Sequence, residues 1–293
     1  MPATNACLKL TAETPAAAAR ARAWRISPVR LGDLICVDEA AGDIGPRIHT
    51  RFGITILPAP AVLRVECSRS VVADRNWAVL TPPSHLHAVR VEDRTAGALT
   101  LLLRAAQRQD LAIPDRPALV PDAALGAEVA ALVARWRRPL RALESVVATR
   151  SVLERLLARS TPLGPSRRAT ALLPVRNYLQ AHPDGPVPIE ALAAMCGLTE
   201  GHLIRAFHME FGLPPHAYHL RVRLAAASDL LAQGLAVSAA AYECGFADQS
   251  HLTRKFREAY GLTPVAWATA AADPRQPSDP PRRATWTPAT AER

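Results

Sequence analysis

The sequence predicts an α+β protein of two domains. The first is a β-barrel or jelly roll followed by helices, and the second is all-α with two helix-turn-helix units. Three observations support this: short β-like runs fill residues 24–104, the apolar pattern becomes helical after Pro121, and a repeat occupies the last hundred residues. The 293 residues are 49% hydrophobic, which is enough for two domains with cores of their own.

Six short apolar runs predict the strands of the first domain. Turn-forming residues separate them, for example Gly45-Pro46 and Pro82-Pro83. Many short strands at close spacing are typical of a barrel or jelly roll. The runs are residues 54–57, 62–65, 71–73, 77–80, 86–91 and 99–103.

Apolar residues then recur at helical spacing and predict helices within residues 122–158. Two roles stay open for these helices, a dimer interface and packing between the domains. The Pro- and Gly-containing stretch that follows predicts a linker. The predicted division is a disordered 1–22, a first domain at 23–160, a linker at 161–170, a helix-turn-helix domain at 171–272 and a disordered Pro-rich tail at 273–293.

Composition narrows the class of protein. The net charge of +9 favours a polyanionic partner, but residues 170–272 hold seven Lys and Arg against eight Asp and Glu. DNA binding must therefore be argued from the geometry of the motifs. The sequence has no run of eighteen apolar residues, no signal-peptide pattern and no CxxC pair, so we expect a cytoplasmic protein without a membrane span, a disulfide framework or a zinc ribbon.

The repeat is the most informative feature. Residues 191–218 match residues 239–267 with an offset of 48 up to a shared Gly and 49 beyond it, so the second copy has one extra residue in its turn. The identities include Ala193/Ala241, Cys196/Cys244, Gly197/Gly245, Leu203/Leu252, Arg205/Arg254, Phe207/Phe256, Gly212/Gly261 and Pro215/Pro264. The symmetry of Cys196 and Cys244 favours a small core residue over a thiol sensor.

Each copy predicts a helix, a tight turn and a second helix. In the first copy Gly197 suits the positive φ that ends a helix, Thr199 suits an N-cap, and Gly212 ends the second helix. Gly245, Asp248 and Gly261 repeat this order in the second copy.

The face opposite the buried side of each second helix is predicted to meet base edges of double-stranded DNA in a major groove. The alternative is a small helical repeat that binds protein. The candidate DNA-binding residues are Gly201, Ile204, Arg205 and His208 in the first copy, and Gln249, Ser250, Thr253, Arg254, Lys255 and Arg257 in the second.

The segment from Leu192 to Trp267 closely resembles the AraC family of transcription regulators. It contains that family's most specific stretch, GF-x-D-Q-S-H-L-T-R-x-F-R-x-x-Y-G-x-T-P. The resemblance implies a linker helix, here residues 216–231 with Gly234 as its stop, that holds two recognition helices about 34 Å apart. It also implies a transcription activator that contacts RNA polymerase, responds to a small-molecule effector and can form a homodimer. Ala240-Ala241-Tyr242 departs from the usual Ile-Ala-x-x.

The N-terminal region resembles the family's cupin-like sensing domain more loosely. The counterparts of the cupin His motifs are Ile48-His49-Thr50-Arg51 and Pro83-Ser84-His85-Leu86-His87, both degraded. We therefore expect no metal and no cofactor, because a metal cupin needs three His and a carboxylate that converge. The candidates for an effector pocket are Arg47, His49, Arg51, His85 and His87.

Two other classes of protein fit the sequence less well. A DNA-repair alkyltransferase would need a metal-binding Cys cluster and a reactive Pro-Cys-His-Arg, and the sequence has neither. A cupin enzyme fused to a DNA reader is disfavoured by the missing metal ligands. We therefore expect a regulator and not an enzyme.

Overall fold

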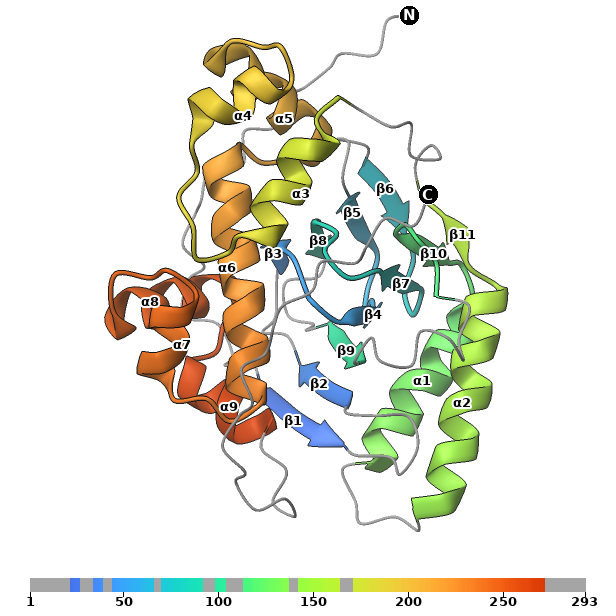
Figure 1. Ribbon diagram of the computed structural model, residues 1–293. Coiled ribbons are helices and arrows are strands. Elements are labelled where there is room, and N and C mark those ends of the chain that lie inside the picture. The colour runs from blue at the N-terminus through green and yellow to red at the C-terminus, as the bar shows by residue number, and fades with distance from the viewer. Residues whose placement is uncertain are drawn as a thin grey trace, which may run out of the picture.

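The computed structural model describes residues 22–26, 34–38, 44–65, 70–91, 98–103, 113–136, 142–163 and 171–271. The predicted disordered ends, apart from Arg22, and residues 164–170 of the predicted linker lie outside this part of the chain. Figure 1 shows a β-sheet region in the middle, with α1 and α2 on one side of it and α3 to α9 on the other.

Two antiparallel sheets form the N-terminal domain. The order of the first is β1-β2-β9-β4-β7-β10-β11, and the order of the second is β3-β8-β5-β6. The strands are β1 Arg22–Ile26, β2 Leu34–Asp38, β3 Ile44–Arg47, β4 Phe52–Ile56, β5 Ala61–Val65, β6 Ser70–Ala73, β7 Ala78–Thr81, β8 His87–Val91, β9 Leu99–Leu103, β10 Ala118–Val120 and β11 Thr161–Pro162.

Alternation along the strands explains how the sheets are covered. In β7, Val79 joins a core cluster with Leu63 of β5 and Val89 of β8, which belong to the other sheet. Its neighbours Ala78 and Leu80 join a different cluster, which includes helix residues. Successive side chains of a strand point to opposite faces, so at β7 the seven-stranded sheet has one face toward the other sheet and one toward helices, whereas Ile35, Val37 and Leu102 of β2 and β9 pack in the core of the C-terminal helices. No described strand pairs across the two sheets, so the domain is a jelly-roll-like sandwich and not a closed barrel.

Helices α1 (Ala123–Trp136) and α2 (Ala142–Ala158) cover the outer face of the larger sheet. Val129 and Val133 of α1 and Leu153 and Leu156 of α2 are buried in the same cluster as Ile54 of β4. The two helices lie on the side of the sheets away from α3 to α9 (Figure 1), so they do not pack between the domains. None of the described helices is both long and apolar enough to cross a membrane.

The six predicted strand runs correspond to β4 through β9. The apolar pattern did not predict β1, β2, β3, β10 and β11, and β11 falls in the stretch expected to be a linker. Both β3 (Ile-Gly-Pro-Arg) and β11 (Thr-Pro) contain a proline, which lowers the strand signal. The α+β two-domain fold class itself is confirmed.

The C-terminal part is all-α. Its helices are α3 Leu173–Ala181, α4 Ile189–Met195, α5 Glu200–Phe211, α6 Pro215–Ala232, α7 Val237–Glu243, α8 Gln249–Tyr260 and α9 Pro264–Ala271. The long helix α6 matches the predicted linker helix, and Gly234 after it has φ 90°. Figure 1 shows α6 running between α3 to α5 at one end and α7 to α9 at the other.

Helix α1 rests directly on the turn before β7, which gives a test of the fold. A Cβ at Gly126 would overlap the carbonyl oxygen of Asn76, which is a backbone atom and not the end of a flexible side chain. We expect Gly126→Ala to lower the free energy of unfolding by about 1–3 kcal/mol, the usual cost of overpacking. Urea unfolding measures this, with Gly45→Ala as the control because nothing lies within 4 Å of a Cβ there. Equal stability of the two variants would contradict this placement of α1.

Candidate nucleic-acid interface

The first helix-turn-helix unit consists of α4 and α5. Gly197, with φ 64°, makes the turn, and the Thr199 hydroxyl accepts a hydrogen bond from the His202 backbone N–H at 3.4 Å. Gly212 ends α5 in the left-handed conformation. Leu203, Phe207 and Phe211 face the core from α5, so the opposite side of the helix is left to solvent.

The second unit, α7 and α8, repeats this construction. Gly245 has φ 68°, the Asp248 carboxylate accepts from the His251 backbone N–H at 2.7 Å, and Gly261 ends α8 with φ 69°. Leu252, Phe256 and Tyr260 are buried. An Asp at the N-cap also complements the helix dipole, which stabilises the start of α8.

Most of the predicted DNA-binding residues are on the solvent side of these two helices. Gly201, Ile204, Arg205 and His208 of α5 and Gln249, Ser250, Arg254 and Arg257 of α8 are exposed, whereas Thr253 and Lys255 are half-buried. The Lys255 ammonium pairs with the Glu258 carboxylate at 2.8 Å and lowers its pKa. Lys255 therefore has less free charge to offer a phosphate than its position alone suggests.

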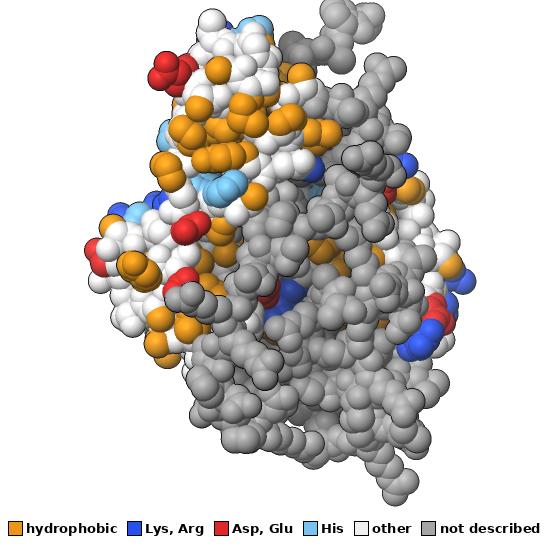
Figure 2. Space-filling model, in the orientation of Figure 1, with side chains coloured by type: hydrophobic (Ala, Val, Ile, Leu, Met, Phe, Trp, Pro, Cys, Tyr) orange, Lys and Arg blue, Asp and Glu red, His pale blue; other side chains and the backbone are white. Residues whose placement is uncertain are grey.

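The two recognition helices differ in surface chemistry. Helix α5 exposes apolar side chains, with Met209 69% and Ile204 37% exposed, and Met195 of α4 is 55% exposed. Hydrophobic side chains gather over the first unit in Figure 2. The exposed positions of α8 are all polar or charged. Helix α8 therefore has more hydrogen-bond donors for base edges and phosphates.

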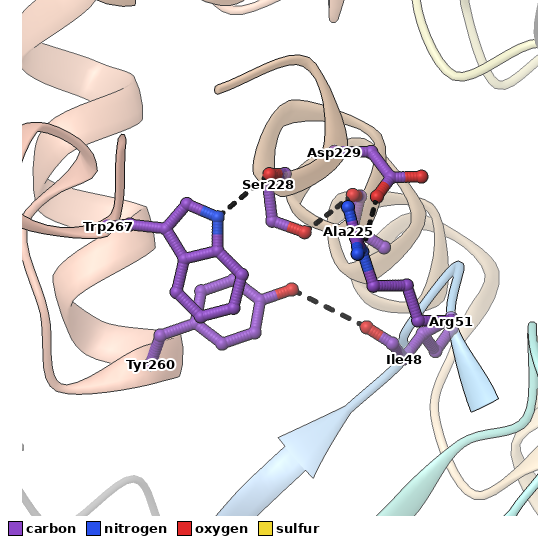
Figure 3. A network of polar contacts seen from close by, with 7 residues as sticks. All are labelled: Ile48, Arg51, Ala225, Ser228, Asp229, Tyr260 and Trp267. Atoms are coloured by element: carbon purple, nitrogen blue, oxygen red, sulfur yellow. Dashed lines mark hydrogen bonds and ion pairs between the residues drawn. The ribbon is translucent and has the colours of Figure 1, made fainter. Parts of the chain in front are cut away.

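The second unit and α6 are joined to the N-terminal domain by a buried polar network (Figure 3). The Arg51 Nε donates to the Asp229 carboxylate of α6 at 2.9 Å, and only 6% of the Arg51 side chain is exposed. The Tyr260 hydroxyl of α8 donates to the Ile48 carbonyl at 3.4 Å, and within the C-terminal part the Trp267 indole of α9 donates to the Ser228 carbonyl of α6 at 2.8 Å. This network fixes the end of α8 and α6 against the segment after β3.

Helices α3 and α6 are joined to the loop before β8. Gln180 of α3 donates to the Ser84 carbonyl at 3.0 Å, and the Tyr218 hydroxyl of α6 lies 3.4 Å from the same oxygen. The Ser84 N–H in turn donates to the His49 carbonyl at 2.7 Å. The two loops of the sandwich that bond to α3, α6 and α8 are therefore bonded to each other.

The structure brings the five effector-pocket candidates together at this contact between the sandwich and the C-terminal helices, which we call the joint. All five are buried: Arg47, His49, Arg51, His85 and His87. The His49 ring centroid lies 5.3 Å from that of His87 and 6.0 Å from that of Tyr260, and the Arg47 guanidinium lies 5.6 Å from the Tyr260 centroid. Arg47, His49 and Arg51 thus contact the DNA-binding part, which was not predicted from the sequence.

Burial of this cluster changes its protonation. Desolvation, reinforced by neighbouring cations, lowers the pKa of His87 to about 4 and the pKa of His49 well below its ordinary value. Desolvation also raises the pKa of Tyr260 to about 12. At neutral pH both imidazoles are uncharged beside Arg47 and Arg51. Among the described residues, no three His, Cys, Asp or Glu side chains are grouped as a metal site requires.

Two partners in the joint were missed by sequence reasoning. Tyr260 occupies the repeat position of Phe211, so its extra hydroxyl was a signal that this copy makes a polar contact that the other does not. Asp229 is the acidic residue of α6, and the residues around it near the end of this helix are mostly buried or apolar. The partners of both lie far away in the sequence, in the other domain.

Comparisons with known proteins place the helix-turn-helix region among transcription regulators. A family model described as a helix-turn-helix domain matches residues 192–270. The probable transcriptional regulator LumQ of Photobacterium leiognathi is 29% identical over 120 residues, which are 40% of this chain and 48% of LumQ. A crystal structure of a probable AraC family transcriptional regulator from Rhodopseudomonas palustris is 34% identical and covers 35% of this chain and 98% of that one, with a TM-score of 0.33. A crystal structure of a ligand-free ToxT variant from Vibrio cholerae covers 86% of this chain and 97% of that one at 10% identity, with a TM-score of 0.49.

Two helix-turn-helix units on a shared long helix define a DNA-binding protein of the double helix-turn-helix class. The chain belongs to the AraC family of transcription regulators. The matching segment spans no more than about half the length of the curated relatives with which it aligns.

The ion pair across the joint can be tested by a double-mutant cycle. Asp229→Asn leaves the buried Arg51 guanidinium without its carboxylate, so we expect the free energy of unfolding to fall by about 1–3 kcal/mol, a value reduced for the partial exposure of Asp229. Arg51→Met combined with Asp229→Asn should be less destabilised than the sum of the single variants. Strict additivity in urea unfolding would show that the two groups do not interact.

The buried histidines predict a pH dependence. Because their pKa values are lower in the folded than in the unfolded protein, the unfolded chain binds more protons between about pH 6.5 and pH 4. Stability should therefore fall as the pH falls through this window. We expect His87→Leu to flatten this fall in thermal unfolding curves, whereas exposed His208→Gln should keep the wild-type slope. An unchanged slope in His87→Leu would refute the assignment.

Proposed function

We propose that this chain is a sequence-specific DNA-binding transcription regulator, a cytoplasmic activator whose recognition helices α5 and α8 enter successive major grooves of a promoter site. The observation that carries the proposal is the matched pair of units on α6. In each unit the second helix has a capped N-terminus and one buried face, and its opposite face is exposed to solvent. A helix of this kind, braced by a short preceding helix, places its outward side chains against base edges.

The exposed side chains indicate which residues read bases and which contact phosphates. Arg254 can donate two parallel hydrogen bonds to a guanine, and Gln249 can pair with an adenine or a phosphate. Arg257 and Lys255 suit the phosphate backbone. On α5, Arg205 and His208 are hydrogen-bond donors, whereas Ile204 offers apolar contact to a thymine methyl group.

We further propose that the sandwich domain, residues 23–160, binds a small-molecule effector and can mediate a homodimer, and that residues 171–272 carry the DNA-binding activity. The joint supports a route for the signal, because Ile48 contacts α8 of the second unit, and Arg51 and Ser84 contact the shared helix α6. An effector near Arg47, His49, Arg51, His85 and His87 would alter these contacts directly. Contact with RNA polymerase follows from the activator role.

Base reading by Arg254 gives the test of the proposal. Duplexes that the full-length chain selects from random sequence supply a site, and single-base substitutions of it supply the comparison. We expect Arg254→Ala to cost about 1–3 kcal/mol and to relax preference at one base pair. Ile204→Ala should cost less than Arg205→Ala.

Variants at the residues proposed to contact the DNA phosphate backbone are the matched controls. Arg257→Ala should weaken all duplexes alike and reduce the salt dependence of binding by about one phosphate contact, and Lys255→Ala should do the same to a smaller degree. If Arg254→Ala weakened every duplex equally, Arg254 would not be a base reader. Failure of the wild-type chain to select any sequence would refute the proposed function itself.

A further inference from the structure

The loop between α3 and α4 links the two helix-turn-helix units through a single arginine of α6. The Arg223 Nε donates to the Pro183 carbonyl and its Nη2 to the Gly185 carbonyl, while its Nη1 donates to the Gly245 carbonyl, each at 2.8 Å. Pro183 and Gly185 precede α4 in the first unit, and Gly245 is the turn glycine of the second unit. One guanidinium thus bridges the two units.

The same loop and turn approach each other closely. A Cβ at Gly245 would lie 2.6 Å from the Asp184 carbonyl oxygen and 3.0 Å from the Asp184 Cα. Nearby, the His219 Nε2 of α6 lies 2.8 Å from the His182 carbonyl oxygen, a hydrogen-bonding distance. Loop 182–185 is therefore held between α6 and the turn of the second unit. In Figure 1 this loop runs beside α6 toward α7 and α8 before it returns to α4.

The apolar cores alone do not tie the two units together in this way. Tyr218, Val222 and Ala225 of α6 belong to the core of the first unit. Leu224, Ala227 and Leu231 belong to the core of the second. Each unit can keep its own core if the angle between the units changes slightly, whereas the Arg223 hydrogen bonds cannot survive such a change.

The chemistry of Arg suits a rigid bridge. Its planar guanidinium holds its donors in a fixed fork, so three bonds at three nitrogens define both the distance and the orientation of the carbonyls. A Lys at this position would supply a compact charge on a flexible stem. Loss of the guanidinium would leave three backbone carbonyls without this donor.

We infer that Arg223 is a positioning residue that sets the distance between α5 and α8 and thereby the number of base pairs between the two half-sites that the protein accepts. The inference rests on the proposed function, in which both helices contact one DNA face. One inserted base pair moves a half-site by about 3.4 Å and rotates it by roughly 35° about the DNA axis. A rigid bridge between the units rejects such a site, and a loosened bridge tolerates it.

The experiment measures binding of the full-length chain to the duplex that the wild type selects from random sequence, and to duplexes with one base pair added or removed between the half-sites. We expect the wild type to lose roughly tenfold or more in affinity for either altered spacing, comparable to a mismatch in the site. Arg223→Met should reduce that loss to about twofold to threefold while the base preferences within each half-site persist. Arg223→Lys should fall between the two.

Gly245→Ala tests the same bridge from its other side, because the added methyl group pushes on the Asp184 backbone. It should also weaken the discrimination between spacings, and Arg257→Ala should lower all affinities and leave the spacing profile unchanged. If Arg223→Lys and every other folded bridge variant showed the same spacing profile as the wild type, the inference would be overturned. That result, obtained with a specific site, would leave the proposed function intact, whereas selection of no site would overturn both.

Discussion

Helix α6 is the element on which the rest of the molecule depends. Ten of its 18 residues are buried, and the helix packs against three partners at once. One side completes the core of the first helix-turn-helix unit, another completes the core of the second, and Asp229 near its end meets Arg51 of the sandwich. Since a helix is stiff over this length, the positions of α5 and α8 are set by how each unit packs on α6 and by the polar bonds that remove the remaining freedom.

A buried ion pair holds the two domains together at their joint. A guanidinium in a protein interior is favourable only when its hydrogen bonds are made, so Arg51 holds the sandwich against α6 only while Asp229 is in place. Close to it lie two imidazoles whose uncharged forms are enforced by burial. Any event that adds or removes charge in this cluster therefore changes the contact with α6 and α8 together, which is a physical basis for communication between the domains.

The sequence was sufficient for the local structure of the repeat but not for its surroundings. Gly197, Gly245, Thr199 and Asp248 have strong and specific backbone preferences, so the turns and caps could be predicted from them. The strands of the sandwich core were predicted from apolar runs, whereas the proline-containing strands were not. The role of His49 at a domain joint could not be predicted, because it depends on a residue about 210 positions away, Tyr260, and His87 takes part only through its contact with His49. The three hydrogen-bond acceptors of Arg223 likewise could not be predicted, because they are backbone carbonyls and the pattern of side chains does not identify them.

In the proposed complex both recognition helices engage one face of the DNA at a spacing fixed by α6. Hydroxyl-radical footprinting of the full-length chain on its selected site tests this most directly. We expect two protected patches on the same face of the duplex, separated by about 10 base pairs, the helical repeat of DNA. A single protected patch, or two patches on opposite faces, would contradict this arrangement.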